Sequence, residues 1–423
     1  MENRSDPATS LLDTLHPTRP GEPVSLVPYK SPEFFQIERE RIFRRAWLNV
    51  GRVEDVPGAG DYIVREVEVL RASILIARGK DEAVRAFYNV CPHRGNKLVN
   101  VPSGSTEAFV CGYHSWTFNT RGALRGVPDK EMFRNLDSAK CGLRAIALEV
   151  WQGFIFVCFD DPPQLSLRQF LGPLGDYLEG LENINQGAIF TVESHLKCNW
   201  KIISDAFLEA YHIQALHRST LKTMYSVTEN RFGRLLQVRS LGFHSMNSMY
   251  GNPDHSPTPE QPIERLAYDP AAIAPQRLAD IMRFAAHRAV NPTRTRTWSM
   301  DKNHVFPNTH FDFGPTGFWT HHFWPISVNE TRHEARFYLP QPAHIRDRFM
   351  QEYQMAHASD VILEDLSNVE RVQLGIESNA FDTMPLSDSE DSIRHSNNTL
   401  IRWAKAANLS EAVAEQVPAE DAA

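Results

Sequence analysis

The sequence of 423 residues predicts an α+β protein in which an antiparallel β domain precedes a larger domain of mixed helices and strands. Three observations support this fold class. Short β-rich runs separated by glycine, proline and aspartate turns fill residues 46–162. The tetrapeptide Asp160-Asp161-Pro162-Pro163 then marks a boundary. Beyond it, residues 163–423 alternate between helix-like and strand-like segments, while residues 1–45 form an N-terminal arm that precedes both domains.

The composition is that of a globular protein. The hydrophobic fraction is 42% and the charged fraction 23%, which excludes global disorder. The net charge of −8, without a basic stripe, argues against nucleic acid as a partner. The strongest apolar run, Val150–Phe159, is too short to span a bilayer, and the opening residues lack the apolar stretch of a signal peptide. We therefore expect a cytoplasmic protein. An odd count of five cysteines favours metal or free-thiol roles over disulfides.

The N-terminal arm contains a proline-rich stretch over residues 1–30. Ser31-Pro32 is typical of a helix N-cap followed by proline at the first helical position, and it predicts a helix that extends to about Arg45. The helix carries several apolar residues, among them Phe34 and Phe35. We expect the arm and this helix to pack on the larger domain.

The β domain is predicted from runs rich in β-branched and aromatic residues. These runs are Tyr62–Val67, Ser73–Ala77, Val84–Asn89, Ala108–Val110 and Ile146–Phe159.

The larger domain combines both periodicities. Helices are expected near residues 166–180, 199–217, 275–288, 348–377 and 388–406. Strands are expected near residues 188–196, 233–248, 304–312, 317–325 and 333–340. The segment Gly251–Glu264, with four prolines, is expected to be a mobile loop.

The β domain contains two matched pairs of metal-ligand residues. Cys91-Pro92-His93 is separated by residues 94–110 from Cys111-Gly112-Tyr113-His114. Each pair follows a strand-like run, so two loops could present two thiolates and two imidazoles to one centre. Such a set suits a zinc ion or a [2Fe–2S] cluster in which two histidines replace two cysteines on one iron. A structural zinc remains the alternative, although zinc fingers more often pair C-x-x-C with H-x₃₋₅-H.

The larger domain contains a segment rich in histidine and carboxylate side chains. On an ideal helix with Asp205 at 0°, Glu209 falls at about 40° and His212 at about −20°, beside an apolar face. Burying these charges is costly, so a cation is expected there. His217 lies about 140° from His212 on an ideal helix, so the helix must end or bulge between them before both can face one ion.

A third acidic ligand is predicted from the helical pattern between Ser359 and Ser378. Asp365 falls within the apolar stripe of this helix, whereas Glu364 falls on the opposite, solvent side. A buried aspartate needs a partner, and a metal ion supplies one. The alternative is an aspartate paired with an arginine or a backbone donor.

The two cysteine–histidine segments resemble the motifs of Rieske non-haem iron oxygenases, the ring-hydroxylating family. Gly112 and Ser115 depart from the commonest family pattern, in which proline precedes the tyrosine and glycine follows the histidine. The resemblance implies a Rieske [2Fe–2S] cluster with Cys91, His93, Cys111 and His114 as its ligands.

The segment from Asp205 to His217 resembles the family's D-x₃-E/D-x-Y-H-x₄-H stretch, which contributes two histidines to a 2-His-1-carboxylate site for mononuclear Fe(II). The resemblance implies the following roles. His212, His217 and Asp365 bind the iron, Glu209 bridges His212 to His114 of the partner subunit as an electron path, and Asp205 orients a ligand.

The resemblance covers nearly the whole chain and implies an antiparallel β Rieske domain inserted before a helix-grip-like α+β catalytic domain. The implied function is that of a terminal oxygenase alpha subunit that hydroxylates an apolar, aromatic substrate with O₂, as in the catabolism of aromatic hydrocarbons. Electrons would come from NAD(P)H through a separate reductase, with or without a ferredoxin. The implied assembly is a homotrimer or an α3β3 complex with a small β subunit.

Other functions remain open from the sequence. Oxidative N- or O-demethylation uses the same iron site. A Rieske electron carrier with a ligand-binding domain is a different class of function, but it would not need the second metal site.

Aromatic and methionine side chains are frequent between the two segments that carry the iron ligands, and they could line an apolar pocket or simply form core. They are Met224, Phe243, Met246, Met249, Trp298, Phe306, Phe311, Phe313, Phe318, Trp319, Phe323 and Trp324. His304, His310, His321 and His322 are not expected to bind the metal, since the ligand set is already complete.

Overall fold

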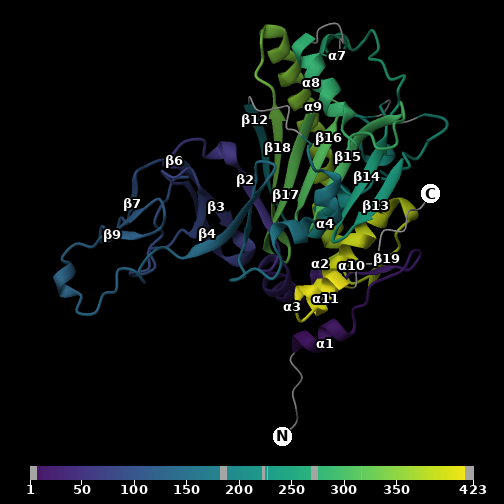
Figure 1. Ribbon diagram of the computed structural model, residues 1–423. Coiled ribbons are helices and arrows are strands. Elements are labelled where there is room, and N and C mark those ends of the chain that lie inside the picture. The colour runs from purple at the N-terminus through teal and green to yellow at the C-terminus, as the bar shows by residue number, and fades with distance from the viewer. Residues whose placement is uncertain are drawn as a thin grey trace. The chain divides into compact units, whose positions relative to one another are not determined.

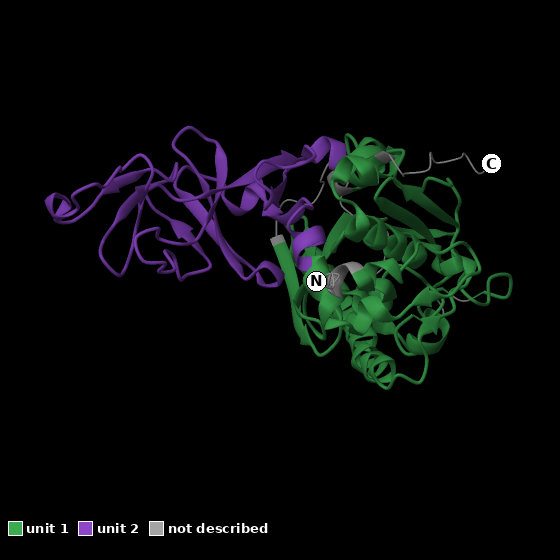
Figure 2. Cartoon of the chain, turned by 90° about the horizontal axis from the view of Figure 1, so that it is seen from below, with its two compact units in different colours: residues 1–38, 171–423 green, residues 39–170 purple. Residues whose placement is uncertain are grey.

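The computed structural model describes residues 7–181, 188–221, 224–225, 227–267, 275–315 and 317–414. The chain forms two compact units (Figures 1 and 2). Residues 39–170 form one of them, called here the β unit; residues 1–38 and 171–423 form the other, called the α+β unit. The domain boundaries predicted after residues 45 and 162 stay predictions.

The β unit is built on a seven-stranded antiparallel sheet with the order β2-β11-β10-β5-β4-β3-β6. Its strands are β2 (Leu48–Arg52), β3 (Asp61–Val67), β4 (Ala72–Arg78), β5 (Val84–Tyr88), β6 (Ser103–Ser105), β10 (Ala145–Trp151) and β11 (Phe154–Cys158). A second sheet contains β7 (Ala108–Val110), β8 (Thr117–Asn119) and β9 (Leu124–Gly126). Short 3₁₀ turns connect these strands: η2 (Val53–Asp55), η3 (Glu68–Leu70) and η4 (Lys130–Met132).

The single run predicted over residues 146–159 is two strands joined by a hairpin. The turn residues Gln152 and Gly153 have positive φ values of 47° and 81°. A two-residue hairpin favours this conformation because its twist matches that of the flanking strands. Because apolar residues continue on both sides of this turn, the sequence analysis predicted one strand instead of two.

The α+β unit is built on a second seven-stranded antiparallel sheet, with the order β12-β18-β17-β16-β15-β14-β13 (Figure 1). Its strands are β12 (Ala188–Leu196), β13 (Gln237–Leu241), β14 (His244–Tyr250), β15 (Trp298–Val305), β16 (Thr309–Gly314), β17 (Gly317–Ser327) and β18 (Glu330–Leu339). The predicted strand near residues 304–312 is in fact the turn between β15 and β16 with parts of both strands. A two-stranded ribbon pairs β1 (Val24–Ser25) with β19 (Thr383–Met384).

One long helix, α9 (Ile345–Glu377), packs on the sheet of the α+β unit (Figure 1). Met355 and Ile362 of α9 form a core cluster with Ala335 and Phe337 of β18. The structure therefore confirms the predicted α+β class, with an antiparallel β unit and a sheet that packs on a long helix.

The remaining helices are α1 (Pro7–Asp13), α2 (Val27–Lys30), α3 (Pro32–Ile37), η1 (Glu38–Phe43), α4 (Leu167–Tyr177), α5 (Trp200–Ala206), α6 (Ile213–Leu216), α7 (Pro262–Ala267), α8 (Pro275–Ala286), η6 (Asp388–Glu390), α10 (Asp391–Lys405) and α11 (Leu409–Ala414). The sequence did not predict α1, α2 and α11, and its prediction differs from the structure at three further places. The predicted helix over residues 31–45 continues from α3 as a π-helix, the loop over residues 251–264 contains the start of α7, and the helix over residues 199–217 is broken.

The N-terminal segment packs in the α+β unit through buried polar contacts. The ammonium of Lys201 donates to Glu38 Oε1 at 2.6 Å, and both side chains are almost fully buried. Tyr29 donates from its hydroxyl to Asp205 Oδ2 at 2.6 Å and accepts from Asn397 at 2.7 Å. Buried polar groups are tolerated only when they are paired, so these contacts specify where residues 27–38 lie on the unit.

Among the described residues, no helix has both the length and the apolar character needed to cross a membrane.

Candidate metal centres

The two cysteine–histidine loops of the β unit share one hydrogen-bonding pattern. In the first loop, Cys91 N–H donates to Asn96 and Gly95 N–H donates to the Cys91 carbonyl, at 2.8 and 3.0 Å. In the second loop, Cys111 N–H donates to Trp116 and Ser115 N–H donates to the Cys111 carbonyl, at 2.8 and 2.9 Å. Each loop therefore closes on itself within six residues, although the histidine follows the cysteine by two positions in the first loop and by three in the second.

Backbone N–H groups point at both sulfurs. Burial raises the pKa of the Cys111 thiol, but the N–H groups of Tyr113 and His114, together with the side chains of Cys91 and Asn96, outweigh burial, so the pKa is lowered. Burial also raises the pKa of the Cys91 thiol, and the N–H groups of His93 and Arg94 oppose that rise without overcoming it. Donors directed at sulfur stabilise a thiolate, which is the form that binds a metal.

The imidazoles of the two loops lie next to each other. The ring centroids of His93 and His114 are 4.6 Å apart, and His93 stacks on Trp116 at 4.7 Å with parallel planes. His114 Nδ1 is buried and has no hydrogen-bond partner among the described residues. Two thiolates and two imidazoles, one of them with an unsatisfied nitrogen, fit a Rieske [2Fe–2S] cluster.

Ser115 occupies a strained backbone position. Its φ is +56°, and the equivalent residue of the first loop, Gly95, has a φ of +75°. This left-handed region is unfavourable for residues with a Cβ atom but not for glycine. The departure from the family pattern at Ser115 therefore introduces local strain while leaving the hydrogen bonds of the loop in place.

The histidines of the α+β unit come together because the predicted helix is broken. Helix α5 ends at Ala206, residues 207–212 are irregular, and α6 starts at Ile213. The prediction that the chain must depart from a helix before His217 is right, but the break already lies before His212. The placement of Glu209 and His212 on one helical stripe with Asp205 is therefore wrong.

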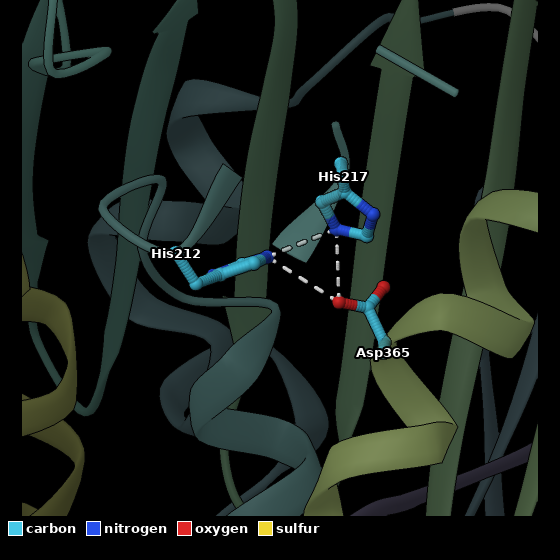
Figure 3. Close-up of side chains that lie close together, drawn as sticks. All are labelled: His212, His217 and Asp365. Carbon is cyan, nitrogen blue, oxygen red and sulfur yellow. Dashed lines mark hydrogen bonds and ion pairs between the residues drawn. The ribbon is translucent and has the colours of Figure 1, made fainter. Parts of the chain in front are cut away.

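Three side chains converge in the α+β unit: His212, His217 and Asp365 (Figure 3). His212 Nε2 lies 3.3 Å from Asp365 Oδ1, and His217 Nε2 lies 3.1 Å from the same oxygen. The two Nε2 atoms are 3.1 Å apart. Two imidazole nitrogens and one carboxylate oxygen directed at one point fit a mononuclear iron ion that keeps open coordination positions.

The electrostatics of this site favour a cation. Burial lowers the pKa of His212, but Asp365 and Glu209 outweigh burial and raise it to about 9. Asp365 is 4% exposed, and His212 and His217 hold its pKa below the ordinary value in spite of burial. Carboxylates gathered around imidazoles in a buried place favour positive charge between them.

The helical projection predicted that Glu364 faces solvent, but the structure does not place it there. Its Oε2 accepts from His217 Nδ1 at 2.8 Å and from the Thr220 hydroxyl at 2.6 Å. The projection failed because it placed side chains relative to α9 alone and ignored the loop that follows α6. A carboxylate behind a ligand histidine fixes the ring orientation and raises its basicity. The sequence analysis did not predict this role of Glu364. The signal that could have indicated it is that Glu364 directly precedes the predicted iron ligand Asp365.

Glu209 lies beside a predicted iron ligand. Its carboxylate contacts His212 Nδ1 and accepts from the backbone N–H groups of Tyr211 and His212. The glutamate is 7% exposed, whereas Tyr211 is 60% exposed. The irregular segment therefore leads from a ligand imidazole to the surface of the unit within a few residues.

Asp205 accepts a hydrogen bond from Tyr29, as described above, and burial raises its pKa to about 7. No hydrogen bond joins it to a ligand histidine within the described residues. Its role in orienting a ligand stays a prediction.

A cavity of about 600 Å³ lies against the iron ligands in the α+β unit. His212, His217 and Asp365 belong to its wall. Its apolar lining includes Phe207, Met249, Phe318, Trp319, Phe337 and Met355. A mostly apolar chamber next to a metal site is typical of a small-molecule substrate site.

The sequence prediction of the pocket residues is correct in part. Of the aromatic and methionine residues proposed, four line the cavity: Met224, Met249, Phe318 and Trp319. Phe243 and Phe306 instead pack against Trp403 in the core. Two buried polar residues of the wall, Lys302 and Asp312, were missed, although the two-residue period of β15 places Lys302 on the same face as Met300.

Comparisons with known proteins agree with this geometry. The family described as "Ring hydroxylating alpha subunit (catalytic domain)" matches residues 183–406. The family described as "Rieske [2Fe-2S] domain" matches residues 46–139.

Two curated relatives act on different kinds of substrate by name. The large oxygenase component of the naphthalene 1,2-dioxygenase system of Pseudomonas aeruginosa is 36% identical over 232 residues, which is 52% of this chain and 50% of that protein. The oxygenase subunit of carnitine monooxygenase of Escherichia coli (strain K12) is 35% identical over 193 residues, which is 45% of this chain and 50% of that protein. The chain thus spans about half the length of the curated relatives it matches.

The solved structure of naphthalene 1,2-dioxygenase with indole bound in the active site has a TM-score of 0.72 and 24% identity to this chain. The match covers 92% of this chain and 94% of that one, and it shows that the two share a fold.

Proposed function

Because the chain belongs to the family of Rieske ring-hydroxylating alpha subunits, we propose that it is the terminal oxygenase of a multicomponent system that oxidises a small organic substrate with O₂. The observation that carries this proposal is the set of His212, His217 and Asp365 on the wall of a cavity large enough for a small molecule. A Rieske electron carrier with a ligand-binding domain would not need these three ligands beside its cavity.

The residues divide the work between two centres. Cys91, His93, Cys111 and His114 would hold the [2Fe–2S] cluster, and the histidines and aspartate of the α+β unit would hold Fe(II). The cluster would supply electrons one at a time, and the iron would supply a site for O₂ activation. For a monooxygenation, the substrate R–H, O₂, two electrons and two protons give R–OH and water.

The chain's own residues then position and shield the reaction. The aromatic wall formed by Phe207, Trp319 and Phe337 would exclude water and hold an apolar body beside the ligands. Glu364 would accept the hydrogen bond from His217 Nδ1 and so keep the His217 ring in one orientation. Positioning and exclusion of water are the contributions that a protein makes to such chemistry.

Glu209 is proposed to carry electrons between subunits. In this proposal its carboxylate bridges His212 to His114 of the partner subunit, and its contacts with His212 and with the exposed Tyr211 segment support the idea. The assembly would be a homotrimer, or an α3β3 complex with a small β subunit, because a head-to-tail interface closes into a ring. The electrons would come from NAD(P)H through a separate reductase, with or without a ferredoxin.

A matched variant tests the role of Glu209. Glu209→Gln should keep both metals but slow the oxidation of the reduced cluster in a single-turnover experiment, because a neutral amide cannot bridge two imidazoles as a carboxylate does. An unchanged rate of cluster oxidation, or a fully active monomer by mass measurement, would contradict this part of the proposal.

The reaction itself is proposed to be the hydroxylation of an apolar, aromatic substrate. The naphthalene dioxygenase relative and the apolar lining of the cavity support it. Oxidative N- or O-demethylation is the second candidate, and it is motivated by the relative named a carnitine monooxygenase, because carnitine is a non-aromatic compound with N-methyl groups. Hydroxylation of the methyl carbon would release formaldehyde, whereas ring hydroxylation would not, so a formaldehyde assay on each product mixture separates the two.

Metal content tests the function as a whole. The proposal predicts about three iron atoms and about two acid-labile sulfides per chain. A brown protein with these values and substrate-dependent O₂ uptake with a surrogate reductase is expected. A colourless, zinc-rich protein without labile sulfide would overturn the proposal.

A further inference from the structure

The wall of the iron cavity carries charged residues where an apolar sheet face is expected. Strands β15, β16 and β17 run side by side, and Lys302 of β15 pairs in register with Asp312 of β16. Both line the cavity together with His321 of β17. Lys302 is 7% exposed and Asp312 is fully buried. Buried charged residues that carry no structural pairing are costly, so they call for a functional explanation.

The carboxylate of Asp312 lies without a hydrogen-bond partner among the described residues. Within the described part of the chain, neither Oδ1 nor Oδ2 accepts a hydrogen bond, although both are buried. His321 Nε2 lies 3.8 Å from Oδ2, within ion-pair range but too far for a hydrogen bond, and burial lowers the pKa of His321 well below its ordinary value. Burial raises the pKa of Asp312 to about 7, and the positive charge of Lys302 and the backbone N–H of Asn303 oppose that rise. The Asn303 N–H does not make a hydrogen bond of normal geometry, so the carboxylate keeps unused acceptor capacity.

Lys302 also lacks a close polar partner among the described residues. Among the described residues its ammonium makes neither an ion pair nor a hydrogen bond, and it lies 5.8 Å from the centre of the Phe207 ring. Burial lowers its pKa, while Asp312, Asp365 and Glu209 act in the opposite direction. An ammonium has three N–H donors, so this side chain leaves donors free at the cavity.

The other charges near Lys302 already have partners. Asp365 is held between His212 and His217, and Glu209 is paired with His212. His321 shares a hydrogen bond of 3.0 Å with His333 through its Nδ1. Lys302 and Asp312 are thus left facing the cavity with one unused donor group and one unused acceptor group.

We propose that Lys302 and Asp312 form the recognition site for the polar end of the substrate, and that this end is a neutral group with both an acceptor and a donor, such as a carboxamide. The carbonyl oxygen would accept from Lys302, and the N–H would donate to Asp312. This inference rests on the proposed function, because it names the substrate class of the same cavity.

Charge balance selects a neutral polar group. A carboxylate attracted to Lys302 is repelled by Asp312, and a cation attracted to Asp312 is repelled by Lys302. A dipolar group instead gains from both charges, because hydrogen bonds to charged partners are stronger than those between neutral groups. A plain hydrocarbon would leave both charges buried without partners. The aromatic wall beside the pair, with Phe207 and Trp319, fits an apolar body attached to this group.

Calorimetry on the oxidised holoenzyme without reductant tests the inference, because binding is then measured without turnover. The probes are benzamide, benzoate, benzylamine and toluene, which share one ring and differ in the attached group. Benzamide should bind at least about tenfold more tightly than toluene, since one hydrogen bond to a charged group corresponds to roughly that factor. It should also bind more tightly than benzoate and benzylamine.

Variants show whether the pair causes the preference. Lys302→Met and Asp312→Asn should each weaken the binding of benzamide about tenfold or more while changing toluene little. Lys302→Met leaves only the negative charge of Asp312, so the affinity for benzylamine should rise. Asp312→Asn leaves only the positive charge of Lys302, so the affinity for benzoate should rise. The double variant Lys302→Met/Asp312→Leu removes both buried charges, so it remains a usable test if a single variant folds poorly, and it should reverse the preference toward toluene. Gln354→Met, another polar residue on the cavity wall, should change the four affinities alike.

The outcomes separate this inference from the proposed function. If the holoenzyme contains three irons and takes up O₂ with a substrate, but prefers toluene, benzoate or benzylamine, the recognition site is wrong and the oxygenase stands. A preference for benzamide that survives the double variant also overturns the inference. A protein without iron or labile sulfide overturns the proposed function instead, whatever the probes show.

Discussion

The ligands predicted for the iron–sulfur cluster lie within residues 91–114 of the β unit, whereas the iron ligands of the α+β unit come from residues 212, 217 and 365. The first set is held by two loops that close on their own backbone hydrogen bonds. The second set depends on a broken helix, a long helix from the other end of the chain and the carboxylates behind them. A centre built from local loops should therefore tolerate distant changes that a centre assembled from remote segments cannot.

The largest effects should come from exchanging the two sets of ligands for alanine. Asp365→Ala should lower turnover by more than about 100-fold and remove the mononuclear iron, while the visible spectrum of the cluster stays intact. Cys111→Ala should bleach that spectrum and leave the iron site able to bind Fe(II). Metal analysis together with absorbance spectroscopy measures both. Loss of both metals in either variant would show that the two centres are not independent.

The buried ion pair between Lys201 and Glu38 should matter more for stability than any exposed pair. Lys201→Met leaves Glu38 buried without a partner and should lower the free energy of unfolding by about 3–5 kcal/mol. Thermal denaturation followed by tryptophan fluorescence measures the shift. Lys405→Met, an exposed lysine of α10, is the matched control and should change the midpoint little. Equal shifts in the two variants would mean that the N-terminal segment does not anchor α5.

A smaller effect is expected from the carboxylate behind His217. Glu364→Gln keeps a side chain of the same shape but weakens the hydrogen bond from His217 Nδ1, so iron affinity should fall about 10- to 100-fold. Competition with an iron chelator measures the affinity, and the cluster spectrum should not change. Asp360→Asn, an exposed position on the same helix, should bind iron as the parent protein does. If the Glu364→Gln variant binds iron as tightly as the parent protein, Glu364 has no positioning role.

The smallest effect concerns strain in the second loop. Ser115→Gly should stabilise the β unit by about 1 kcal/mol, because φ of +56° suits glycine better than serine. The midpoint of guanidinium-induced loss of the visible absorbance measures it. Gly112→Ala is the matched control in the same loop, because a Cβ atom there meets no atom within 4 Å, and its midpoint should be nearly unchanged. If Ser115→Gly lowers the midpoint, the hydroxyl stabilises the loop more than the strain destabilises it.

The same contrast explains how much could be predicted from the sequence. The α+β class, most strands and the matched cysteine–histidine loops follow from local periodicity and spacing. Asp365 was also found from its place on the apolar stripe of α9. These features depend on residues close together in the chain, and the structure places them as predicted.

The errors in the sequence prediction concern residues whose surroundings are formed by segments distant in the sequence. Helix α5 ends early, so Glu209 and His212 lie in an irregular segment that an ideal helical projection cannot describe. Glu364 is turned toward His217 by a contact across the unit. The pairing of Lys302 with Asp312 needs the register of two strands, and strand register is decided by tertiary packing and turn geometry.

The register between β15 and β16 has a consequence for how the cavity could change in evolution. Val305 pairs with Thr309, and a short turn between them determines which residues of the two strands face each other. Side chains alternate between the two faces of a strand, so shifting one strand by a single residue would exchange its whole inward set for its outward set. An insertion or deletion of one residue in that turn would remove Asp312 from the cavity and bring a neighbour inward. The polarity of the chamber could thus switch in one genetic step without any substitution in its wall.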